Sequence, residues 1–318
     1  MSLIDSLINS DKTAFSFETL PPLKGNSFTK VCNIIDKLRE FDPKYINITT
    51  HHSEYIYRET PNGLLEKINI RKRPGTVAIA AAIQNKYHIP AIPHIICKGF
   101  TKAETEYALI DLQFLGVHDI LLLRGDANKL DKDQIIDPKL NHEHATDLIE
   151  QVNNYNKGID LEGDHFEKPT TPFSYGVACY PEKHEEAPNM ESDISFLKKK
   201  VEMGAEYAVT QMFFDNSKYF SFVDKCREKG INIPIIPGIK PIVLLSQLTV
   251  LPKIFRTDIP EPLANELNKC KSDEEAKQVG IEWCIEQCKE LIRYGVPSLH
   301  FYTLLATDSV RQIAKAIY

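Results

Sequence analysis

The sequence predicts an α/β fold of the (β/α)8 TIM-barrel type, with extra helices between the seventh and eighth strands. Short apolar segments alternate with helical patterns along all 318 residues, and repeated strand–helix units require right-handed crossovers and a parallel sheet. Eight such units can be traced, which suits a closed barrel better than an open sheet. Neither a GxGxxG fingerprint nor a P-loop is present, although a doubly wound sheet typically carries a glycine fingerprint after its first strand.

The first half of the chain supplies four predicted strands, each followed by a helix. The strands are expected over 15–20, 45–50, 91–97 and 119–124, and the helices over 27–41, 76–87, 101–116 and 143–155. The third helix has a capping-box pattern, with Thr101 followed by Glu104, and Gly116 suits its C′ position. The fourth strand is a continuous apolar run, as expected for a strand that is covered on both faces.

The second half repeats the pattern with a longer interruption. Its strands are expected over 173–180, 207–213, 234–238 and 298–304, and its helices over 192–203 and 218–229, with a helical insertion over 243–270. A further helix begins at Ser272, a good N-cap, with three acidic residues in its first turn. No composition break marks a linker, so residues 1–318 are expected to form a single domain.

Composition narrows the class of protein. A hydrophobic content of 42%, 26% charged residues and a net charge of −6 are ordinary for a soluble enzyme, and no basic cluster predicts a nucleic-acid partner. Seven cysteines without a CxxC pair indicate neither a disulfide framework nor a zinc site, and they favour a reducing compartment. Because no secretion signal or membrane span is found, a cytoplasmic location is expected.

Polar side chains gather where the predicted strands end, which is where barrels of this type carry their active sites. In strand order these are Glu18; Thr49, Thr50, His51 and His52; His94; Arg124, Gly125 and Asp126; Tyr180 with Glu182 and His184; Gln211; and Lys240. Pro21 ends the first strand abruptly and so holds Glu18 near the end of a rigid element. Together these residues outline a polar cup.

Each of these residues also has a structural interpretation. Glu18 alone is equally consistent with a helix cap or a salt bridge, and His94 with a satisfied core histidine. Arg124 and Asp126 could form a structural ion pair, but the intervening Gly125 favours close approach of backbone to a ligand.

Further alternatives concern metals, amides and phosphates. No metal site is expected, because adjacent histidines at 51 and 52 cannot easily point at one ion from a strand. Gln211 on a buried strand needs several hydrogen-bond partners, which favours ligand contact. Asp193 and Lys200 share a helix stripe; Lys199 and Lys200 could meet phosphates or could belong to a solvated face.

Ten short segments, in order along nearly the whole chain, resemble the methylenetetrahydrofolate reductase family in its compact bacterial form. They are FETLPP at 17–22, NIT at 47–49, PH at 93–94, LRGD at 123–126, HATDL at 144–148, YPEKHEEA at 180–187, Lys200, TQMFFD at 210–215, PGIKP at 237–241 and HFYTL at 300–304. No single segment is diagnostic, but the ordered set is highly specific.

This resemblance implies an FAD-containing barrel that oxidises NADH or NADPH and reduces 5,10-methylenetetrahydrofolate to 5-methyltetrahydrofolate in one-carbon and methionine metabolism. Hydride would pass from the nicotinamide to flavin N5 and then to the one-carbon unit, in a ping-pong scheme. Bacterial relatives suggest a homo-oligomer by analogy.

The resemblance also implies roles for individual residues. Glu18 would be the general acid that opens the folate ring to an iminium, which requires a raised pKa, and Asp126 would lie near both flavin and pterin. Gln211 matches a contact with both substrates, and Gln247 matches one more loosely. The positions that match FAD contacts are Thr49, His94, Arg124, Gly125, Asp126, His144, Ala145, Tyr180, His184, Asp193, Lys199 and Lys200.

The chain departs from the family pattern at three strand ends. Thr19 and Leu20 replace aromatic residues after Glu18, residues 50–52 replace an aromatic and small residues, and residues 305–306 replace an Asn-Arg pair. His144 stands where a tyrosine is more usual. These changes affect the expected flavin seating, nicotinamide preference and folate-tail contact.

Two other functions remain open from the sequence. A flavin-free barrel lyase or aldolase would use a strand-end lysine for a Schiff base, and Lys240 is the candidate. A reductase-like subunit that no longer uses NAD(P)H directly is the other.

Overall fold

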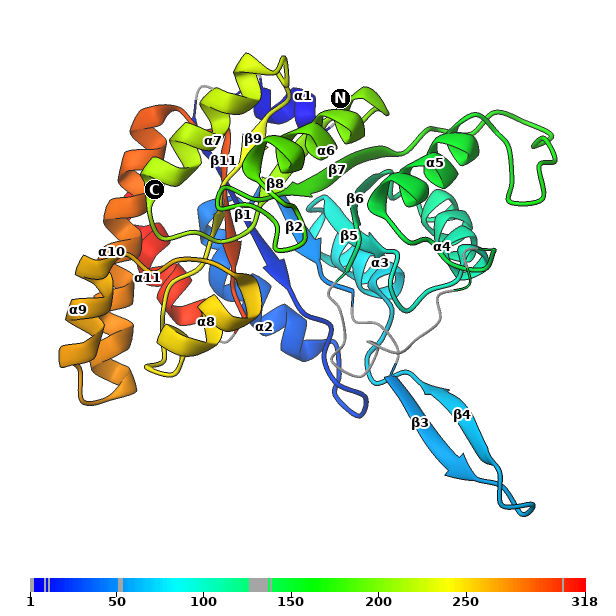
Figure 1. The fold of residues 1–318 in the computed structure, drawn as a ribbon, viewed down its shortest axis with the longest axis horizontal. Coiled ribbons are helices and arrows are strands. Elements are labelled where there is room, and N and C mark those ends of the chain that lie inside the picture. The colour runs from blue at the N-terminus through cyan, green and yellow to red at the C-terminus, as the bar shows by residue number, and fades with distance from the viewer. Residues whose placement is uncertain are drawn as a thin grey trace. The chain divides into compact units, whose positions relative to one another are not determined.

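The fold is described from a computed structural model that covers residues 3–8, 10, 12–50, 54–125, 137, 139–304 and 306–318 (Figure 1). These residues form two compact units. Unit 1 comprises Met1–Thr19, Asn33–Asn47 and Ser174–Tyr318, and unit 2 comprises Leu20–Cys32 and Ile48–Phe173. The single-domain assignment of residues 1–318 stays a prediction.

Unit 1 is built from parallel strands. They are β1 (Ala14–Thr19), β2 (Tyr45–Ile48), β7 (Ser174–Cys179), β8 (Tyr207–Thr210), β9 (Ile235–Ile236), β10 (Gly238–Ile239) and β11 (Ser298–Tyr302). β1 and β10 both pair with β11, and β8 pairs with both β7 and β9; every one of these ladders is parallel. The strands are largely buried, so their side chains are covered on both faces, as parallel sheets require.

The seventh barrel strand is divided at Pro237 into β9 and β10. Proline has no N–H to donate to a ladder, and the two halves pair with different neighbours, β9 with β8 and β10 with β11. Because β9 and β10 stand at opposite ends of the strand order, the sheet closes on itself through this residue. The predicted (β/α)8 barrel is therefore confirmed.

Helices alternate with the strands. In chain order they are α1 (Leu3–Ile8), α2 (Thr29–Leu38), the short 3-10 turn η1 (Arg39–Phe41), α3 (Thr76–Tyr87), α4 (Lys102–Phe114), α5 (Ala145–Asn156), α6 (Met190–Glu202), α7 (Asn216–Glu228), α8 (Gln247–Phe255), α9 (Glu261–Lys269), α10 (Asp273–Tyr294) and α11 (Thr307–Ile317). The capping predictions hold, since Thr101 and Glu104 form a capping box and the Ser272 side chain accepts a hydrogen bond from the Glu275 N–H.

The predicted helical insertion between the last two barrel strands consists of two helices, α8 and α9. α8 ends at Arg256, which has a left-handed φ of 55°, and α9 begins after Pro260. Both pack with α10 over a buried apolar cluster that includes Met212, Leu251 and Leu267. Met212 and Ile242 of this cluster belong to the segments that follow β8 and β10.

In β1 the two faces of the strand are chemically distinct. Phe15 lies 5.5 Å from Phe301, 5.6 Å from Phe41 and 5.7 Å from Tyr318, measured between ring centroids. Side chains alternate along a strand, so Ser16 and Glu18 project from the opposite face. Apolar packing on one face thus fixes the direction of the polar side chains on the other.

Unit 2 contains β5 (Ala91–Ile96) and β6 (Asp119–Leu123), which form a parallel pair, and an antiparallel hairpin. The hairpin strands, β3 (Glu54–Glu59) and β4 (Leu65–Ile70), pair only with each other among the strands described (Figure 1). The sequence analysis missed this hairpin and extended the second barrel strand to residue 50, whereas β2 ends at Ile48. The turn signal was present in Asn62–Gly63, with Gly63 at a φ of 74°.

Replacing Gly280 tests the packing of α10 against the segment that follows β10. A Cβ atom at this buried position would lie 1.9 Å from the backbone oxygen of Ile242, so Gly280→Ala must displace backbone. We expect the free energy of unfolding to fall by about 2 kcal/mol or more, measured by urea denaturation. Gln278→Ala on the exposed side of the same helix should change it by less than about 0.5 kcal/mol; equal effects would contradict this packing.

Candidate active site

The strand register of unit 1 aligns three ionisable side chains at the end of the barrel. Glu18 on β1 pairs with Tyr302 on β11. Gly238 and Ile239 on β10 pair with His300 and Phe301, so extending this register by one residue brings Lys240 level with Tyr302. Residues at the same level of adjacent parallel strands project from the same face. Glu18 and Lys240 therefore flank Tyr302 on the same side of the sheet.

Glu18 lies near the end of β1, as the sequence predicted, and only 6% of its surface is exposed. Its backbone oxygen accepts a hydrogen bond of 2.5 Å from Thr303 Oγ1, and Tyr302 Oη donates to the backbone oxygen of Thr210 at 2.6 Å. Burial lowers the pKa of Lys240, and the negative charge of Glu18 partly opposes that shift. Glu18 and Lys240 thus interact electrostatically within one buried layer.

A second polar layer lies one pleat deeper in the barrel. Ser16 Oγ lies 3.0 Å from His300 Nδ1, and the His300 ring stacks on Tyr45 with centroids 5.9 Å apart. Asn47, on β2, is fully buried, and neither atom of its amide has a hydrogen-bond partner within the part of the chain that the structure describes. The sequence analysis did not select Asn47, although a polar residue inside a buried strand was a usable signal.

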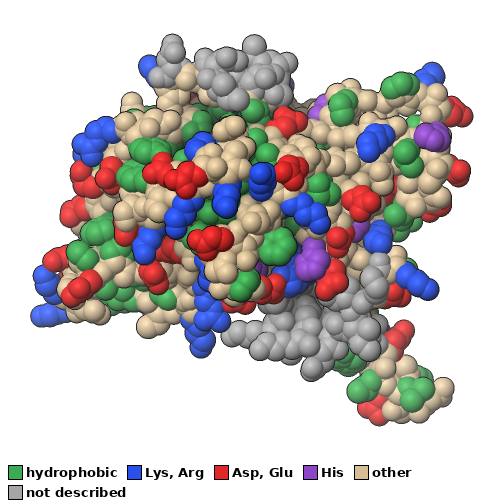
Figure 2. All heavy atoms as spheres, turned by 45° about the horizontal axis from the view of Figure 1, so that its top comes forward, with side chains coloured by type: hydrophobic (Ala, Val, Ile, Leu, Met, Phe, Trp, Pro, Cys, Tyr) green, Lys and Arg blue, Asp and Glu red, His purple; other side chains and the backbone are tan. Residues whose placement is uncertain are grey.

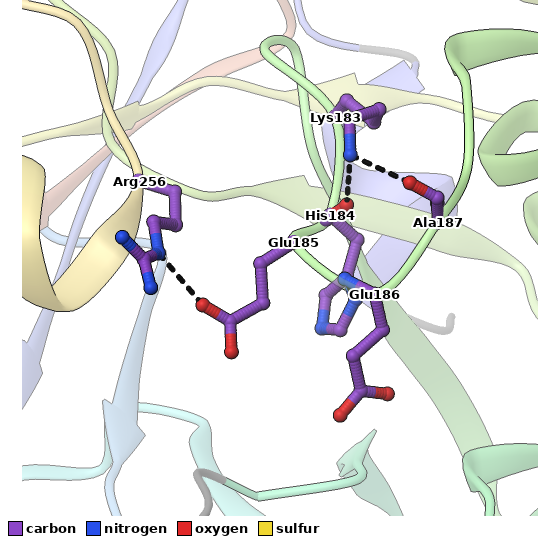
Figure 3. Close-up of polar contacts among 6 residues, drawn as sticks. All are labelled: Lys183, His184, Glu185, Glu186, Ala187 and Arg256. Atoms are coloured by element: carbon purple, nitrogen blue, oxygen red, sulfur yellow. Dashed lines mark hydrogen bonds and ion pairs between the residues drawn. The ribbon is translucent and has the colours of Figure 1, made fainter.

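The loop after β7 folds back on the side chain of Lys183 (Figure 3). Lys183 has a left-handed φ of 76°, and its Nζ donates hydrogen bonds to the backbone oxygens of His184 (3.0 Å) and Ala187 (2.6 Å). His184 Nδ1 accepts a hydrogen bond from the Glu186 N–H at 3.2 Å, which places the ring proton of the neutral imidazole on Nε2. The Tyr180 and His184 rings meet edge to face at 4.7 Å, so this loop positions both predicted residues.

Two carboxylates attach this loop to the segment after α8. Glu182 Oε2 accepts hydrogen bonds from Thr257 Oγ1 (2.8 Å) and from the Asp258 N–H (3.0 Å), and burial raises the pKa of Glu182. Glu185 forms an exposed ion pair with Arg256 at 2.8 Å (Figure 3). The half-buried Glu182 contact is the stronger anchor, because solvent screens exposed ion pairs more strongly.

The two predicted cationic residues of helix α6, Lys199 and Lys200, differ in their exposure to solvent. Lys200 Nζ donates to the backbone oxygen of Ala178 at 2.8 Å, and burial lowers the pKa of Lys200, opposed by Cys179 and Asp193. Asp193 Oδ2 accepts a hydrogen bond from the His184 N–H at 2.9 Å. Lys199 is exposed, so the structure groups Lys200, but not Lys199, with the His184 loop.

The two predicted glutamines are both held by local hydrogen bonds. Gln211 follows β8 rather than lying within it, is half-buried, and its Oε1 accepts from the Met212 N–H at 2.9 Å. Gln247 begins α8, and its Oε1 accepts from the N–H groups of Val243 (2.7 Å) and Leu244 (3.1 Å). These contacts orient both amides through their oxygens.

In unit 2 the predicted residues lie at the ends of β5 and β6 and at the start of α5. His94 is buried on β5, and its Nε2 has no hydrogen-bond partner among the described residues. Burial lowers the pKa of His94 from 6.5 to about 3, so the ring is neutral. Thr49 follows β2, and the next residue, Thr50, donates a side-chain hydrogen bond to the backbone oxygen of His94.

Arg124 and Gly125 follow β6 and are half-buried. Gly125 has a φ of 84°, a conformation that favours glycine whether or not a ligand approaches. His144 is the N-cap residue of α5, where its N–H donates to Asp147 Oδ2 at 2.9 Å, and Ala145 is the first residue of the helix. The predicted residues His51, His52, Asp126 and Leu305 lie outside the described residues.

Other features of the described residues bear on the class of protein. They contain no group of three or more His, Cys, Asp or Glu side chains that could hold a metal ion. No helix in the same ranges is both long and apolar enough to cross a membrane. All seven cysteines are free thiols, and acidic and basic side chains are interspersed on the face shown in Figure 2.

A (β/α)8 barrel with ionisable groups at the carboxyl ends of its strands belongs to the class of barrels that carry an active site there. The family described as methylenetetrahydrofolate reductase matches residues 3–318 of this chain. The 5,10-methylenetetrahydrofolate reductase of Escherichia coli is 30% identical over 290 residues, which cover 91% of this chain and 85% of that protein. The chain belongs to the methylenetetrahydrofolate reductase family, as its sequence motifs indicated.

Two further similarities extend this result. The probable methylenetetrahydrofolate reductase (NADPH) of Caenorhabditis elegans is 30% identical over 99% of this chain, but the chain spans only 43% of that protein. A solved structure from Clostridium thermocellum superposes with a TM-score of 0.59 at 16% identity, covering 99% of both chains. That protein is described as binding two copies of 5-methyl-5,6,7,8-tetrahydrofolic acid; the likeness itself shows the shared fold.

Removing each loop anchor separately tests their relative strength. Glu182→Ala leaves the Asp258 N–H without its acceptor and leaves the Thr257 hydroxyl only the backbone oxygen of Met212 at 3.1 Å, so we expect a loss of about 1–3 kcal/mol in unfolding free energy. Glu185→Ala removes only an exposed pair and should cost less than about 1 kcal/mol. Urea denaturation of both variants makes the comparison, and a larger effect at Glu185 would contradict it.

The neutral, buried His94 predicts acid sensitivity. The unfolded chain takes up a proton as the pH falls below 6.5, whereas the folded protein resists protonation at His94 until about pH 3. Stability is therefore present above pH 6.5 and is lost as the pH falls through this window, by up to about 5 kcal/mol at 1.4 kcal/mol per pKa unit. His94→Gln should flatten this part of the pH–stability curve, measured by urea denaturation.

The matched control for His94 is His165→Gln, because His165 is exposed. This variant should keep the acid dependence of the parent protein. An unchanged curve in His94→Gln would mean that other groups cause the acid sensitivity.

Proposed function

We propose that this protein is an FAD-dependent methylenetetrahydrofolate reductase. It would reduce 5,10-methylenetetrahydrofolate to 5-methyltetrahydrofolate at the expense of NADH or NADPH, in one-carbon and methionine metabolism. Family membership supports the reaction. The observation that carries the assignment of the chemistry is the buried carboxyl of Glu18, held at the end of a barrel strand beside Tyr302 and Lys240.

The residues present suit a flavin. His94 offers a neutral ring with a buried nitrogen that lacks a partner among the described residues, and Lys200 and Arg124 supply positive charge for a pyrophosphate. We propose FAD contacts at Thr49, His94, Arg124, Gly125, Asp126, His144, Ala145, Tyr180, His184, Asp193, Lys199 and Lys200. FAD would supply the acceptor and donor of hydride between the two substrates.

Glu18 is proposed as the general acid. Protonation of the folate ring nitrogen by the Glu18 carboxyl would break the adjacent N–CH2 bond, leaving the one-carbon unit as an electrophilic iminium. Burial favours the protonated carboxyl that this step needs. Asp126, Gln211 and Gln247 are proposed to hold the substrates; the hydrogen bonds that the side-chain oxygens of Gln211 and Gln247 accept from nearby backbone N–H groups support a fixed orientation of both amides.

Partners and location complete the proposal. NADH or NADPH and the folate would use the enzyme in turn. A homo-oligomer is proposed by analogy with bacterial relatives, and a cytoplasmic location is supported by the seven free thiols.

Glu18→Gln separates the two half-reactions. We expect the purified protein to be yellow, and the variant to be bleached by NADH or NADPH at the parental rate, because hydride transfer to the flavin needs no acid at residue 18. Reoxidation by methylenetetrahydrofolate should fall by about 100-fold or more, the usual contribution of a general acid. Anaerobic stopped-flow absorbance measures both rates, and full folate turnover in the variant would remove Glu18 from this role.

One observation supports the alternative function as a lyase. Lys240 is buried and burial lowers its pKa, which is typical of lysines that form Schiff bases. A colourless protein that binds no flavin, and that borohydride links covalently to a carbonyl compound, would favour this function. A bound flavin that neither nicotinamide reduces would favour the subunit alternative.

A further inference from the structure

Lys240 is a buried lysine to which the proposed reaction assigns no task. It follows β10 in the barrel wall, is 7% exposed, and its Nζ lies 3.5 Å from the backbone oxygen of Leu304. A solvated surface charge does not account for this position. The cost of burying an ammonium group is high unless a compensating charge or hydrogen bonds are present.

Glu18 supplies a compensating charge when its carboxyl is ionised. The β10–β11–β1 register places both side chains beside Tyr302 on the same face of the sheet, and the Glu18 carboxylate is the group that opposes the effect of burial on Lys240. The two residues come from segments more than two hundred positions apart in sequence. Only the barrel register brings them together.

We propose that Lys240 is a positioning residue for the folate half-reaction, whose ammonium group stabilises the carboxylate that Glu18 becomes after it has given its proton to the folate. This inference rests on the proposed function of Glu18. Lys240 stays protonated throughout and acts through Glu18, with no contact to the substrate assigned to it. The proton lost by Glu18 is carried by the folate ring nitrogen, so charge and protons balance.

Two opposing effects on Glu18 explain why both residues are needed. Burial alone makes a carboxyl a weak acid that holds its proton, while a neighbouring cation makes it a stronger one. A general acid works best when its pKa lies near the working pH, which requires the two effects to offset each other. Lys240 is the neighbouring cation that lowers the pKa of Glu18 in this arrangement.

Three other titratable groups near Glu18 and Lys240 carry no charge that would shift the pKa of Glu18. Burial, followed by the charge of Glu18, raises the pKa of Tyr302 well above 10, and burial also raises the pKa values of Cys179 on β7 and Tyr45 on β2. These three groups are therefore neutral at neutral pH. Tyr180 after β7 and His300 on β11 are the remaining titratable neighbours of Tyr302.

The direct test follows the proton on Glu18 in the purified holoenzyme without substrate. Infrared difference spectroscopy records the protonated-carboxyl band as a function of pH, and Glu18→Gln identifies the band by removing it. We expect Lys240→Met to raise the midpoint of that titration by about one unit or more, and Lys240→Arg to restore most of the parental value. An unchanged midpoint in Lys240→Met overturns the proposal.

A kinetic arm separates this inference from the proposed function. In Lys240→Met, reduction of the flavin by NADH should keep its rate, while reoxidation by methylenetetrahydrofolate falls about tenfold or more and its pH optimum shifts upward with the titration midpoint. Lys253→Met, which changes an exposed lysine on α8, should match the parent in both half-reactions. Equal loss in both half-reactions would overturn the proposal.

The remaining outcomes are also decisive. If the parent protein carries flavin that the folate cannot reoxidise, the proposed function fails, whatever the infrared titration shows. If borohydride traps a carbonyl compound on the parent but not on Lys240→Arg, Lys240 is a nucleophile and the proposal is overturned. If Lys240→Met does not fold, Lys240→Gln replaces it in the same titration.

Discussion

The pairing of β11 with both β1 and β10 is the constraint on which the candidate active site depends. Glu18, Tyr302 and the residues before Lys240 are placed by the register of the parallel strands β1, β10 and β11. A shift of one residue in either ladder would turn every side chain of that strand to the other face. The aromatic packing around Phe15 opposes such a shift, because it would move that ring from the apolar face into the polar interior.

Much of the fold could be predicted from the sequence because its signals are local. The continuous apolar run of β6, the capping box at Thr101 and the N-cap at Ser272 depend on a few adjacent residues, and the structure contains all three. The hairpin β3–β4 was missed because its strands are mostly exposed and lack the apolar alternation that marks a half-buried strand. The division of the seventh strand depends on which neighbour each half pairs with, and that information is not local.

The candidate site divides in the same way. Glu18, Tyr180 and His94 could be selected because each polar residue ends or interrupts an apolar strand. The role of Lys183 could not, since its value lies in closing a loop through two backbone oxygens and in a left-handed φ that lysine rarely adopts. The placement of Glu18 and Lys240 on either side of Tyr302 was equally hidden, because it requires the register of three strands rather than any spacing along the chain.

Pro237 fixes the position at which the barrel closes, between β9 and β10. An ordinary residue at this place would present an N–H to one of two competing neighbours, and strand seven could then extend its pairing with β8 or with β11. Pro237 has no N–H to donate, and its carbonyl oxygen accepts a hydrogen bond from the His300 N–H. It therefore marks the point where pairing with β8 ends and pairing with β11 begins. The strand changes its pairing partner at Pro237, three residues before Lys240. The proline at which the barrel closes therefore also determines where along the barrel axis Lys240 lies.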